Sequence, residues 1–304
     1  MASVLFDDGT ATPPVFRFAP SPNGLLHLGH ALSALVNFEL CQAHGGRFLL
    51  RMEDIDIVRC TPAFEDAIFE DLAWLGVAWD EPVRRQSVHF DDYAEALDTL
   101  RDAGLIYPAT LSRAALKRAI SAAEADGEEW PRDPDGAPLY PTDERHRPQT
   151  EQQIIASGEE PFAWRLNVDA ALAHLGIASV YWPTFNSETD ELLEAKGDPT
   201  VWGDVILARR ETPTSYHLSV VMDDAVQGVS HVVRGRDLEP ATAIHRVIQM
   251  LLGLPCPSYH HHDLVLADDG RKLSKSQDDT SLASLRASGL TPDDIRRMVG
   301  LSPV

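Results

Sequence analysis

The first regular pattern along the chain is a short strand, a turn-rich loop and a helix. Residues 15–19 form a partly alternating apolar run that stops at a cluster of turn formers, residues 20–24. From His30, apolar residues recur at helical spacing until Gly45-Gly46, a pair suited to a helix end. A second buried strand is predicted at residues 47–52. Such a strand-helix-strand unit is typical of a doubly wound α/β fold, so we expect a nucleotide site at its loop.

The rest of the chain alternates helical and strand-like segments around one irregular stretch. Apolar spacing and capping residues predict further helices at residues 61–75, 91–103, 240–252, 282–287 and 292–299. Further strands are predicted at residues 162–168, 201–210 and 216–222. Residues 124–149 contain five of the 21 prolines and show no periodicity, which indicates a long loop within an insertion.

Composition narrows the classes of protein that fit this pattern. The chain has 304 residues, about two domains or one α/β domain with a large insertion, and a net charge of −21. With 44% hydrophobic and 24% charged residues and no apolar run of about 20 residues, it is neither disordered nor membrane-spanning. Its three cysteines, Cys41, Cys60 and Cys256, are far apart, and no basic leader is present, so we expect a cytoplasmic protein without disulfides. The acidity argues against a broad nucleic-acid coat, so any RNA contact should be local.

The sharpest candidate for chemistry is the segment from Phe18 to His30, which ends in His27-Leu28-Gly29-His30. Two imidazoles three residues apart at a helix start lie on one face, beside backbone N–H groups that have no intrahelical partner. Together they can hold a polyphosphate, and Gly29 lets a nucleotide approach the backbone closely. Taken alone, the motif is equally compatible with two solvated or capping histidines.

A second candidate is a glycine-led, hydroxyl-rich loop at residues 269–276, which carries Arg271, Lys272 and Lys275. Lysines on such a loop can close over a triphosphate and neutralise the charge that develops as pyrophosphate leaves. Taken alone, this loop is also compatible with an ordinary basic surface turn. The two motifs together, an HxGH helix start after the first strand and a KxSKS loop late in the chain, resemble the signature of class I aminoacyl-tRNA synthetases.

Four further segments resemble the glutamyl branch of that family. They are residues 17–24, 51–56, 215–224 and 231–238. Glutaminyl enzymes have a glutamate near the position of Ser21, so the sequence Ala-Pro-Ser at this point favours glutamate as the substrate. The resemblance therefore implies a ligase that uses ATP to form glutamyl-adenylate.

The resemblance also implies a fold and a division of the chain. We expect a doubly wound, Rossmann-type α/β catalytic domain, with its first half at residues 14–106 and its second half at residues 201–276. An inserted, acceptor-type α/β subdomain is expected at residues 107–200. Full-length glutamyl-tRNA synthetases carry a large helical anticodon-binding domain after the KxSKS loop, whereas residues 277–304 have room only for a short helical tail, so we expect no such domain. The truncated relatives with this architecture are glutamyl-queuosine tRNA(Asp) synthetases, which activate glutamate without tRNA and attach it to the queuosine base of tRNA(Asp).

Site residues follow from the same resemblance. Glutamate has two carboxylates and an ammonium, which need guanidinium groups and an anion, respectively. Arg17 and Arg234 are expected to bind a carboxylate with Tyr216 as a hydroxyl donor, and Glu53 is expected to bind the ammonium. Phe18, Ala19, Pro20 and Ser21 complete the expected glutamate contacts. Taken singly, Arg17 and Glu53 are as compatible with a surface ion pair, and Tyr216 with a core aromatic.

The ATP-binding residues implied by the family are His27, Gly29, His30 and Lys275, with Mg²⁺ accompanying the phosphates. The same two histidines with Lys272 and Lys275 are the implied catalytic residues, which position the reactants and stabilise charge without a protein nucleophile. Four carboxylates are interpreted as supporting or capping residues rather than catalytic ones: Asp54, Asp56, Asp223 and Asp224.

A structural zinc site is predicted to be absent. Many family members carry a zinc site of Cys and Tyr in the insertion, but the corresponding positions here are Ala109, Leu111 and Glu144, and only Tyr140 matches. This set lacks the thiolates that a tetrahedral zinc site needs. The consecutive histidines at residues 260–262 point in different directions and are expected to cap a strand at the surface.

Two alternatives stay open at this point. One is a glutamyl-tRNA synthetase that charges a tRNA 3′ end without an anticodon domain, and the other is a non-catalytic binding module with a synthetase fold. Intact HLGH and KLSKS motifs argue against the second. The expected partners are L-glutamate, ATP and queuosine-containing tRNA(Asp), with no membrane. Residues 231–250 carry a local charge of about +1, so RNA contact is expected near the active-site mouth.

Overall fold

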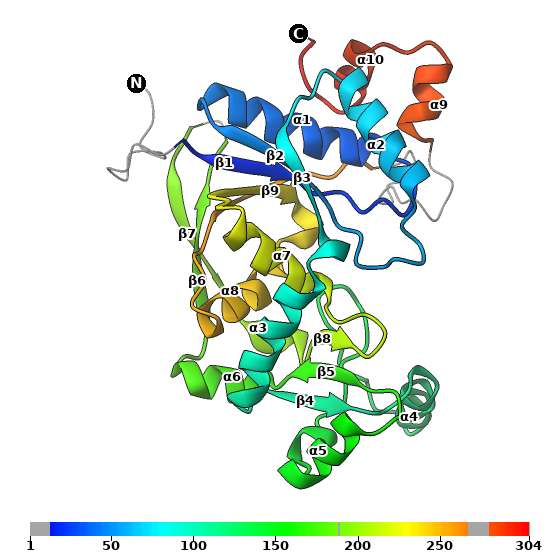
Figure 1. Ribbon diagram of the computed structural model, residues 1–304, viewed down its shortest axis with the longest axis vertical. Helices are drawn as coiled ribbons and strands as arrows, with labels where there is room; N and C mark the ends of the chain where they lie inside the picture. The colour runs from blue at the N-terminus through cyan, green and yellow to red at the C-terminus, as the bar shows by residue number, and fades with distance from the viewer. Residues whose placement is uncertain (1–12, 188, 267–279, 304) are drawn as a thin grey trace.

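The computed structural model describes residues 13–187, 189–266 and 280–303, and parallel strands form its centre (Figure 1). One sheet contains β1 (Val15–Phe18), β2 (Arg47–Met52) and β3 (Asp80–Arg85), all parallel. The other contains β9 (His231–Gly235), β10 (Ser258–His262) and β6 (Val180–Phe185), also parallel, with β7 (Leu192–Gly197) antiparallel at its edge. The doubly wound α/β prediction is confirmed by this arrangement.

The two sheets meet edge to edge between β1 and β9. The N–H of Ser230, directly before β9, donates to the carbonyl of Val15 (3.0 Å), and Ser230 Oγ accepts the Val15 N–H (2.8 Å). The strand order is therefore β3-β2-β1-β9-β10-β6-β7. The strand order runs outward in opposite directions from β1 and from β9. The junction between these two strands is therefore the topological switch point, where doubly wound folds bind ligands.

Helices cover both faces of these sheets, so the central strands β1, β2 and β9 are buried on two sides. Successive residues of β1 belong to different cores: Phe16 and Phe18 pack with α1, whereas Val15 packs on the opposite face. The first face carries α1 (Leu28–Ala43), α2 (Pro62–Trp74), α9 (Leu282–Ala287) and α10 (Pro292–Met298). The second face carries α3 (Phe90–Asp102), α6 (Val168–Leu175), α7 (Tyr216–Val226) and α8 (Thr242–Leu251).

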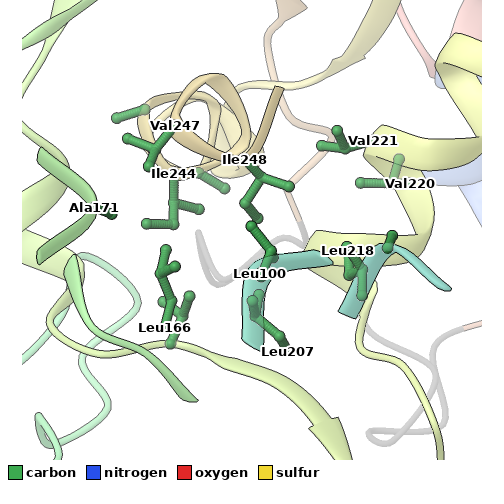
Figure 2. Packing of buried hydrophobic residues seen from close by; sticks show 14 of the residues in the cluster. Leu100, Leu166, Ala171, Leu207, Leu218, Val220, Val221, Ile244, Val247 and Ile248 are labelled. Carbon is green, nitrogen blue, oxygen red and sulfur yellow. The ribbon is translucent and has the colours of Figure 1, made fainter. Parts of the chain in front are cut away.

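A smaller antiparallel sheet continues the core of the second face. It consists of β4 (Ile106–Ala109), β5 (Ala163–Leu166) and β8 (Ile206–Arg209), with α4 (Arg113–Ala125) and α5 (Gln149–Ser157) outside it. Figure 2 shows Leu166 and Leu207 of this sheet packed toward Ile244 and Ile248 of α8. Short 3-10 turns complete the described chain at Gln86–Val88, Asp143–His146, Pro199–Trp202 and Arg236–Leu238.

Sheet membership crosses the boundary that we drew at residue 200. Strands β6 and β7 precede residue 200, yet β6 pairs with β10 in the parallel sheet. Strand β8 follows residue 200, yet it pairs with β5 of the antiparallel sheet. The division into two catalytic halves and one insertion stays a prediction, and the insertion's sheet draws a strand from each side of that residue.

One predicted strand is wrong. Residues 216–222 form the first two turns of α7, which begins after Ser215 and continues to Val226. Leu218, Val221 and Met222 fit a helical period, but Leu218, Val220 and Met222 alternate as in a strand, and burial on several sides obscured the difference. The predicted strand at 201–210 is also shortened, because the 3-10 turn that ends at Trp202 occupies its first part.

The three histidines at residues 260–262 do not cap a strand at the surface. They are part of β10, which lies between β9 and β6 inside the sheet. Within the described ranges, no helix is long and apolar enough to cross a membrane.

Candidate active site

The HLGH segment forms the N-terminus of α1, at the carboxyl end of β1. His27 is the N-cap, and its Nδ1 accepts the Gly29 N–H (3.1 Å). In return, His30 Nδ1 accepts the His27 N–H (3.2 Å), and the two ring centroids lie 3.9 Å apart. A Cβ at residue 29 would lie 3.1 Å from Cε1 of His27, so glycine makes room for that ring. The two imidazoles thus cap the helix through their Nδ1 atoms, in agreement with the simpler of the two interpretations of this motif.

The second motif, with Lys272 and Lys275, lies outside the described residues. Directly after this segment the chain returns to the start of α1. Ser281 forms a β-bridge with His27, and the Leu282 N–H donates to the Leu26 carbonyl (2.8 Å). The chain that follows the KLSKS motif is therefore attached to the HLGH helix start.

The residues expected to bind glutamate come from separate parts of the chain and meet near the β1–β9 junction. Arg17 leaves β1 on the face opposite Phe16 and Phe18, and its Nη1 donates to the Val233 carbonyl (3.5 Å). Glu53 follows β2, and its N–H donates to the Pro20 carbonyl (3.0 Å), which ties it to the predicted Ala-Pro-Ser contacts. Since the Phe18 side chain packs in the core beside α1, only its backbone faces the loop.

Tyr216 and Arg234 meet at this junction as well. Tyr216 is the first residue of α7, and Arg234 lies on β9, next to the Val233 carbonyl that Arg17 contacts. Arg234 Nη1 donates to the Tyr216 hydroxyl (3.4 Å). The fold therefore brings Arg17, Glu53, Tyr216 and Arg234 into one region, although no single sequence segment contains two of them.

Two buried guanidinium groups, one partly buried guanidinium group and three carboxylates form a balanced cluster, which we call the carboxylate cluster: Arg17, Arg51, Arg84, Glu53, Asp223 and Asp224. Asp224 Oδ1 accepts from Arg17 Nε (3.1 Å) and Arg51 Nη1 (2.8 Å). Asp223 accepts from Arg84 Nε (2.7 Å) and from buried polar neighbours. The interpretation of Asp223 and Asp224 as supporting residues agrees with these contacts.

Burial and charge act in opposite directions on the acids of this cluster. Burial acts to raise the pKa of Asp224, but Arg17 and Arg51 outweigh it and hold that pKa below its usual value. Burial raises the pKa of Glu53 despite Arg51 and Arg17. Glu53 is bonded to Arg51 through a single contact of 3.3 Å, so it is the least neutralised anion of the cluster.

Arg234 is surrounded differently, by a group that we call the histidine cluster: His217, His245, His261, Thr242 and Tyr216. Its Nε donates to His261 Nε2 (3.2 Å), its Nη1 to His245 Nδ1 (3.3 Å), and its Nη2 to Thr242 Oγ1 (2.7 Å). The residue is 5% exposed. Across residues 13–187, 189–266 and 280–303, no carboxylate oxygen lies within 4.0 Å of a guanidinium nitrogen of Arg234.

The histidines of this cluster are neutral near pH 7. Burial, together with the nearby charge of Arg234, lowers the pKa of His217 to about 4 and that of His261 to about 3. Burial also places the pKa of His245 well below its usual value. These neutral histidines therefore do not compensate the positive charge of Arg234.

Sequence reasoning missed His217, His245 and Thr242, and it interpreted His261 as a surface residue. A signal was present, because Thr242, His245 and Gln249 are buried polar residues that recur at helical spacing on α8. On β10, His261 lies two residues from buried Tyr259, so both side chains belong to one face of the strand. The same alternation turns His260 away, toward the Phe185 carbonyl (3.2 Å).

A cavity of about 430 Å³ lies beside the histidine cluster, at the carboxyl ends of β6 and β10. His261 and Tyr259 line it, together with Phe185 and Arg236. Its volume is within the range of small-molecule sites. This open space reaches His261 of the histidine cluster on the side of the sheet where doubly wound folds bind ligands.

The remaining predicted acids have local partners. Asp54 accepts from the backbone N–H (2.8 Å) and hydroxyl (2.6 Å) of Ser87, and Asp56 accepts from Arg59 Nε (2.6 Å). Both contacts are those of supporting residues. Lys272 and Lys275 excepted, every predicted site residue lies in the described part of the chain.

The four positions that correspond to the family's zinc ligands lie together on β4 and the loop before α5. The Tyr140 hydroxyl accepts the Leu111 N–H (2.9 Å) and bonds to Glu144, which also accepts the Thr110 N–H (2.8 Å) and pairs with Arg147 (2.5 Å). A hydrogen-bonded carboxylate thus links these segments. Among the residues that the structure describes, no group of three or more His, Cys, Asp or Glu side chains could hold a metal ion, and the absence of zinc stays a prediction.

A comparison with protein families decides the identity of the fold. Residues 15–302 match the family of tRNA synthetases class I (E and Q), catalytic domain. The chain belongs to this synthetase family. The resemblance inferred from the HLGH and KLSKS motifs is confirmed.

Individual relatives within the synthetase family are close in sequence and length. A glutamyl-Q tRNA(Asp) synthetase of Rhodobacter capsulatus is 46% identical over 294 residues, covering 94% of this chain and 100% of that protein. A glutamyl-Q tRNA(Asp) synthetase of Geobacter sulfurreducens is 36% identical, covering 97% of this chain and 87% of that protein. A glutamate–tRNA ligase of Prochlorococcus marinus is 34% identical, and this chain spans 57% of its length.

Solved synthetase structures support the same fold. A crystal structure of a glutamate tRNA ligase from Elizabethkingia meningosepticum, in complex with its amino acid, aligns with a TM-score of 0.74 at 25% identity. The alignment covers 94% of this chain and 60% of that chain. The described fold is therefore that of a class I synthetase catalytic domain, and the protein is similar to enzymes of this family.

Proposed function

We propose that this synthetase activates L-glutamate with ATP in the absence of tRNA and then transfers the glutamyl group to the queuosine base of tRNA(Asp). Two relatives named glutamyl-Q tRNA(Asp) synthetase, matched over nearly their whole length, support this choice. Glutamate–tRNA ligases match over little more than half of theirs. The proposed partners are L-glutamate, ATP and queuosine-containing tRNA(Asp).

The observation that carries the proposal is the uncompensated charge of Arg234. A buried guanidinium without a carboxylate is costly unless a ligand supplies the anion. The Tyr216 hydroxyl accepts from Arg234, so its own hydrogen can donate to the same ligand. Ser215 Oγ, one residue earlier, is buried and has no hydrogen-bond partner among the described residues. These three groups favour a carboxylate ligand.

The opposite side of the pocket suits an ammonium group. Glu53 has only one long contact with Arg51, and burial raises its pKa, so a bound cation would stabilise its charged form. Arg17 lies between the two sides, held by Asp224. An amino acid with a side-chain carboxylate matches this order of charges, because it presents anionic and cationic groups to different edges of the pocket.

Activation then requires an oxygen of the glutamate α-carboxylate to attack the α-phosphorus of ATP. The new bond joins that oxygen to phosphorus, the bond from the α-phosphorus to the bridging oxygen breaks, and pyrophosphate leaves with the electron pair. We propose that His27 and His30 at the N-terminus of α1 orient the phosphates, together with Lys272 and Lys275. Mg²⁺, when bound with ATP, would neutralise part of the phosphate charge.

Transfer requires a hydroxyl of the queuosine cyclopentene ring to attack the carbonyl carbon of glutamyl-adenylate. The hydroxyl proton is lost and AMP leaves, which gives an ester. No nucleophile of this chain is needed in either step. The acidic net charge of −21 supports weak, salt-sensitive RNA binding with few phosphate contacts.

Glutamate-dependent ATP–pyrophosphate exchange without RNA tests the first step, and transfer of [¹⁴C]glutamate to tRNA(Asp) with and without queuosine tests the second. We expect exchange without RNA and label only on queuosine-containing tRNA(Asp). Exchange that requires tRNA would favour 3′-end charging, and equal labelling of both tRNAs would overturn the queuosine assignment.

A variant in the KLSKS motif sharpens the test of catalysis. Lys275→Ala should lower the exchange rate by about a hundred- to a thousand-fold, as the loss of one charge-stabilising donor does. The exposed residue Lys196 on β7 provides a matched control, and Lys196→Ala should leave exchange unchanged. No exchange by the wild-type protein under any condition would indicate a non-catalytic binding module.

A further inference from the structure

The acceptors around Arg234 fix the orientation of its guanidinium group. Of its five N–H groups, four meet acceptors: His261, His245, Tyr216 and Thr242. The second N–H of Nη2 meets no acceptor among the described residues. The guanidinium plane is therefore fixed on all sides but one, and every group that fixes it is formally neutral.

Proton positions in the histidine cluster follow from the fact that a guanidinium can only donate. Arg234 Nη1 donates to His245 Nδ1, so neutral His245 carries its proton on Nε2. That Nε2 lies 3.1 Å from His217 Nδ1 and donates to it. By the same reasoning, His261 accepts at Nε2 and carries its proton on Nδ1. One direction of hydrogen bonding thus runs from Arg234 through His245 to His217.

We propose that His245 and His261 are positioning residues, which hold the Arg234 guanidinium in place as neutral acceptors and leave its charge for the substrate carboxylate. This inference rests on the proposed glutamate activation and specifies how its carboxylate site is built. The low pKa values of both side chains support the neutral form. A carboxylate in either position would hold the guanidinium equally well, but it would also compensate the charge.

The carboxylate cluster provides the internal comparison for this step. There, Asp224 holds Arg17 and Arg51 through hydrogen bonds of 3.1 and 2.8 Å and compensates charge at the same time. Histidine at residues 245 and 261 separates those two effects. The imidazole nitrogen supplies a directed lone pair, whereas burial prevents it from gaining a proton that would repel Arg234.

Three substitutions at residue 245 distinguish positioning from packing. His245→Gln retains a neutral acceptor, so the KM for glutamate should stay within about three-fold of the wild type. His245→Leu removes the acceptor and should raise that KM about ten-fold, the loss of one hydrogen bond to a charged group. His245→Glu supplies a competing anion and should raise it most. The KM for ATP should not change in any of them.

A matched control lies outside the histidine cluster, on α6. His174 is exposed, so His174→Gln should leave the KM for glutamate unchanged. Thermal unfolding of each variant checks that it is folded. A His245→Leu variant with the wild-type KM for glutamate, or one in which both KM values rise equally, would overturn the positioning role.

A readout without catalysis keeps this inference separate from the proposed reaction. In ¹⁵N-resolved NMR spectra of the whole protein at pH 7, His245 should be the neutral tautomer protonated at Nε2, and His261 the one protonated at Nδ1. A charged imidazolium at either residue, or the opposite tautomers, would contradict the assignment even if glutamate activation is confirmed. Failure of exchange by the wild type, with the expected tautomers, would instead remove the proposed function and with it the carboxylate role of this cluster.

Discussion

Two clusters around buried arginines lie beside each other at the β1–β9 junction, and they differ in whether a carboxylate compensates the arginine charge. Arg17 and Arg51 share Asp224 and belong to a cluster with equal numbers of guanidinium groups and carboxylates. Arg234 is as deeply buried, but its acceptors are imidazole nitrogens and hydroxyl oxygens. The two clusters adjoin on β9, since Arg17 Nη1 donates to the Val233 carbonyl, one residue before Arg234.

The difference indicates which group contributes to folding and which to binding. A buried charge whose partner is within the chain is satisfied before any ligand arrives, and removing that partner leaves an uncompensated charge. A buried charge with neutral acceptors remains unfavourable until an external anion arrives. We therefore expect substitutions at Asp223 and Asp224, the supporting acids of the carboxylate cluster, to affect stability and substitutions at Arg234 to affect glutamate use.

The largest effect is expected for Asp224→Asn. This change removes the shared carboxylate of Arg17 and Arg51, and it should lower the free energy of unfolding by about 3–5 kcal/mol, as for other broken buried ion pairs. Urea unfolding monitored by circular dichroism measures it. Asp56→Asn is the control, because its ion pair with Arg59 is exposed and worth at most about 1 kcal/mol. Equal losses for both variants would contradict the balanced-cluster interpretation.

Arg234→Gln should show the reverse behaviour. Loss of the charge should reduce kcat/KM for glutamate roughly 30- to 5,000-fold, which corresponds to a loss of about 2–5 kcal/mol in transition-state stabilisation. Its free energy of unfolding should stay within about 1 kcal/mol of the wild type or rise, because an uncompensated buried charge is removed. A stability loss as large as that of Asp224→Asn would show that the two clusters do not differ.

Glu144→Ala tests a balanced group far along the chain, between β4 and α5. Glu144 accepts from Thr110 and pairs with Arg147, so its removal should cost about 1–3 kcal/mol of unfolding free energy. The KM for glutamate should not change. Glu151, which is exposed and pairs with the same Arg147 at 3.3 Å, gives the matched control Glu151→Ala. A changed KM for glutamate would connect this region to the site.

The smallest expected effect is a pH dependence of stability that arises from the histidine cluster. Unfolded histidines gain protons below about pH 6.5, whereas folded His217 stays neutral down to about pH 4. The unfolded state then binds more protons, so stability falls as the pH decreases from 6.5 toward 4. Each such histidine should cost about 1 kcal/mol at pH 6 relative to pH 8.

Urea unfolding at the two pH values measures this dependence. His245→Gln should reduce the loss between pH 8 and pH 6, since one low-pKa group is removed from beside Arg234, Arg17 and the other histidines. His174 on α6, which is exposed, serves as the control, and His174→Gln should not change the slope. An unchanged slope for His245→Gln would mean that the pKa of folded His245 is close to that of an unfolded histidine.

Local patterns predicted the start of the fold well and one central helix badly. The strand, loop and helix at residues 15–43 were recognisable because turn formers and helical spacing coincide there. Residues 216–222 were assigned to a strand, since Leu218, Val220 and Val221 are all buried and the period of the segment is therefore ambiguous. Packing of α7 against α3 and α8 decided between helix and strand.

The candidate site was predictable in part, for the same reason. Arg17, Glu53, Tyr216 and Arg234 were recognised through a family resemblance, and the structure places them in one region. The histidine cluster was not recognised, because its members come from α7, α8 and β10 and have no common local motif. The pairing of β9 with β10 sets His261 beside Arg234, and the packing of α7 against α8 brings His217 to His245.

The sequence by itself determined the synthetase family, the short strand-helix-strand start and the residue types that a glutamate pocket needs, because these depend on local spacing and on ordered motifs. The tertiary structure decided which buried arginine has its charge compensated and which does not. That distinction depends on whether a carboxylate or an imidazole lies about 3 Å from each guanidinium. Such distances arise from contacts between residues up to 216 positions apart, which no local pattern records.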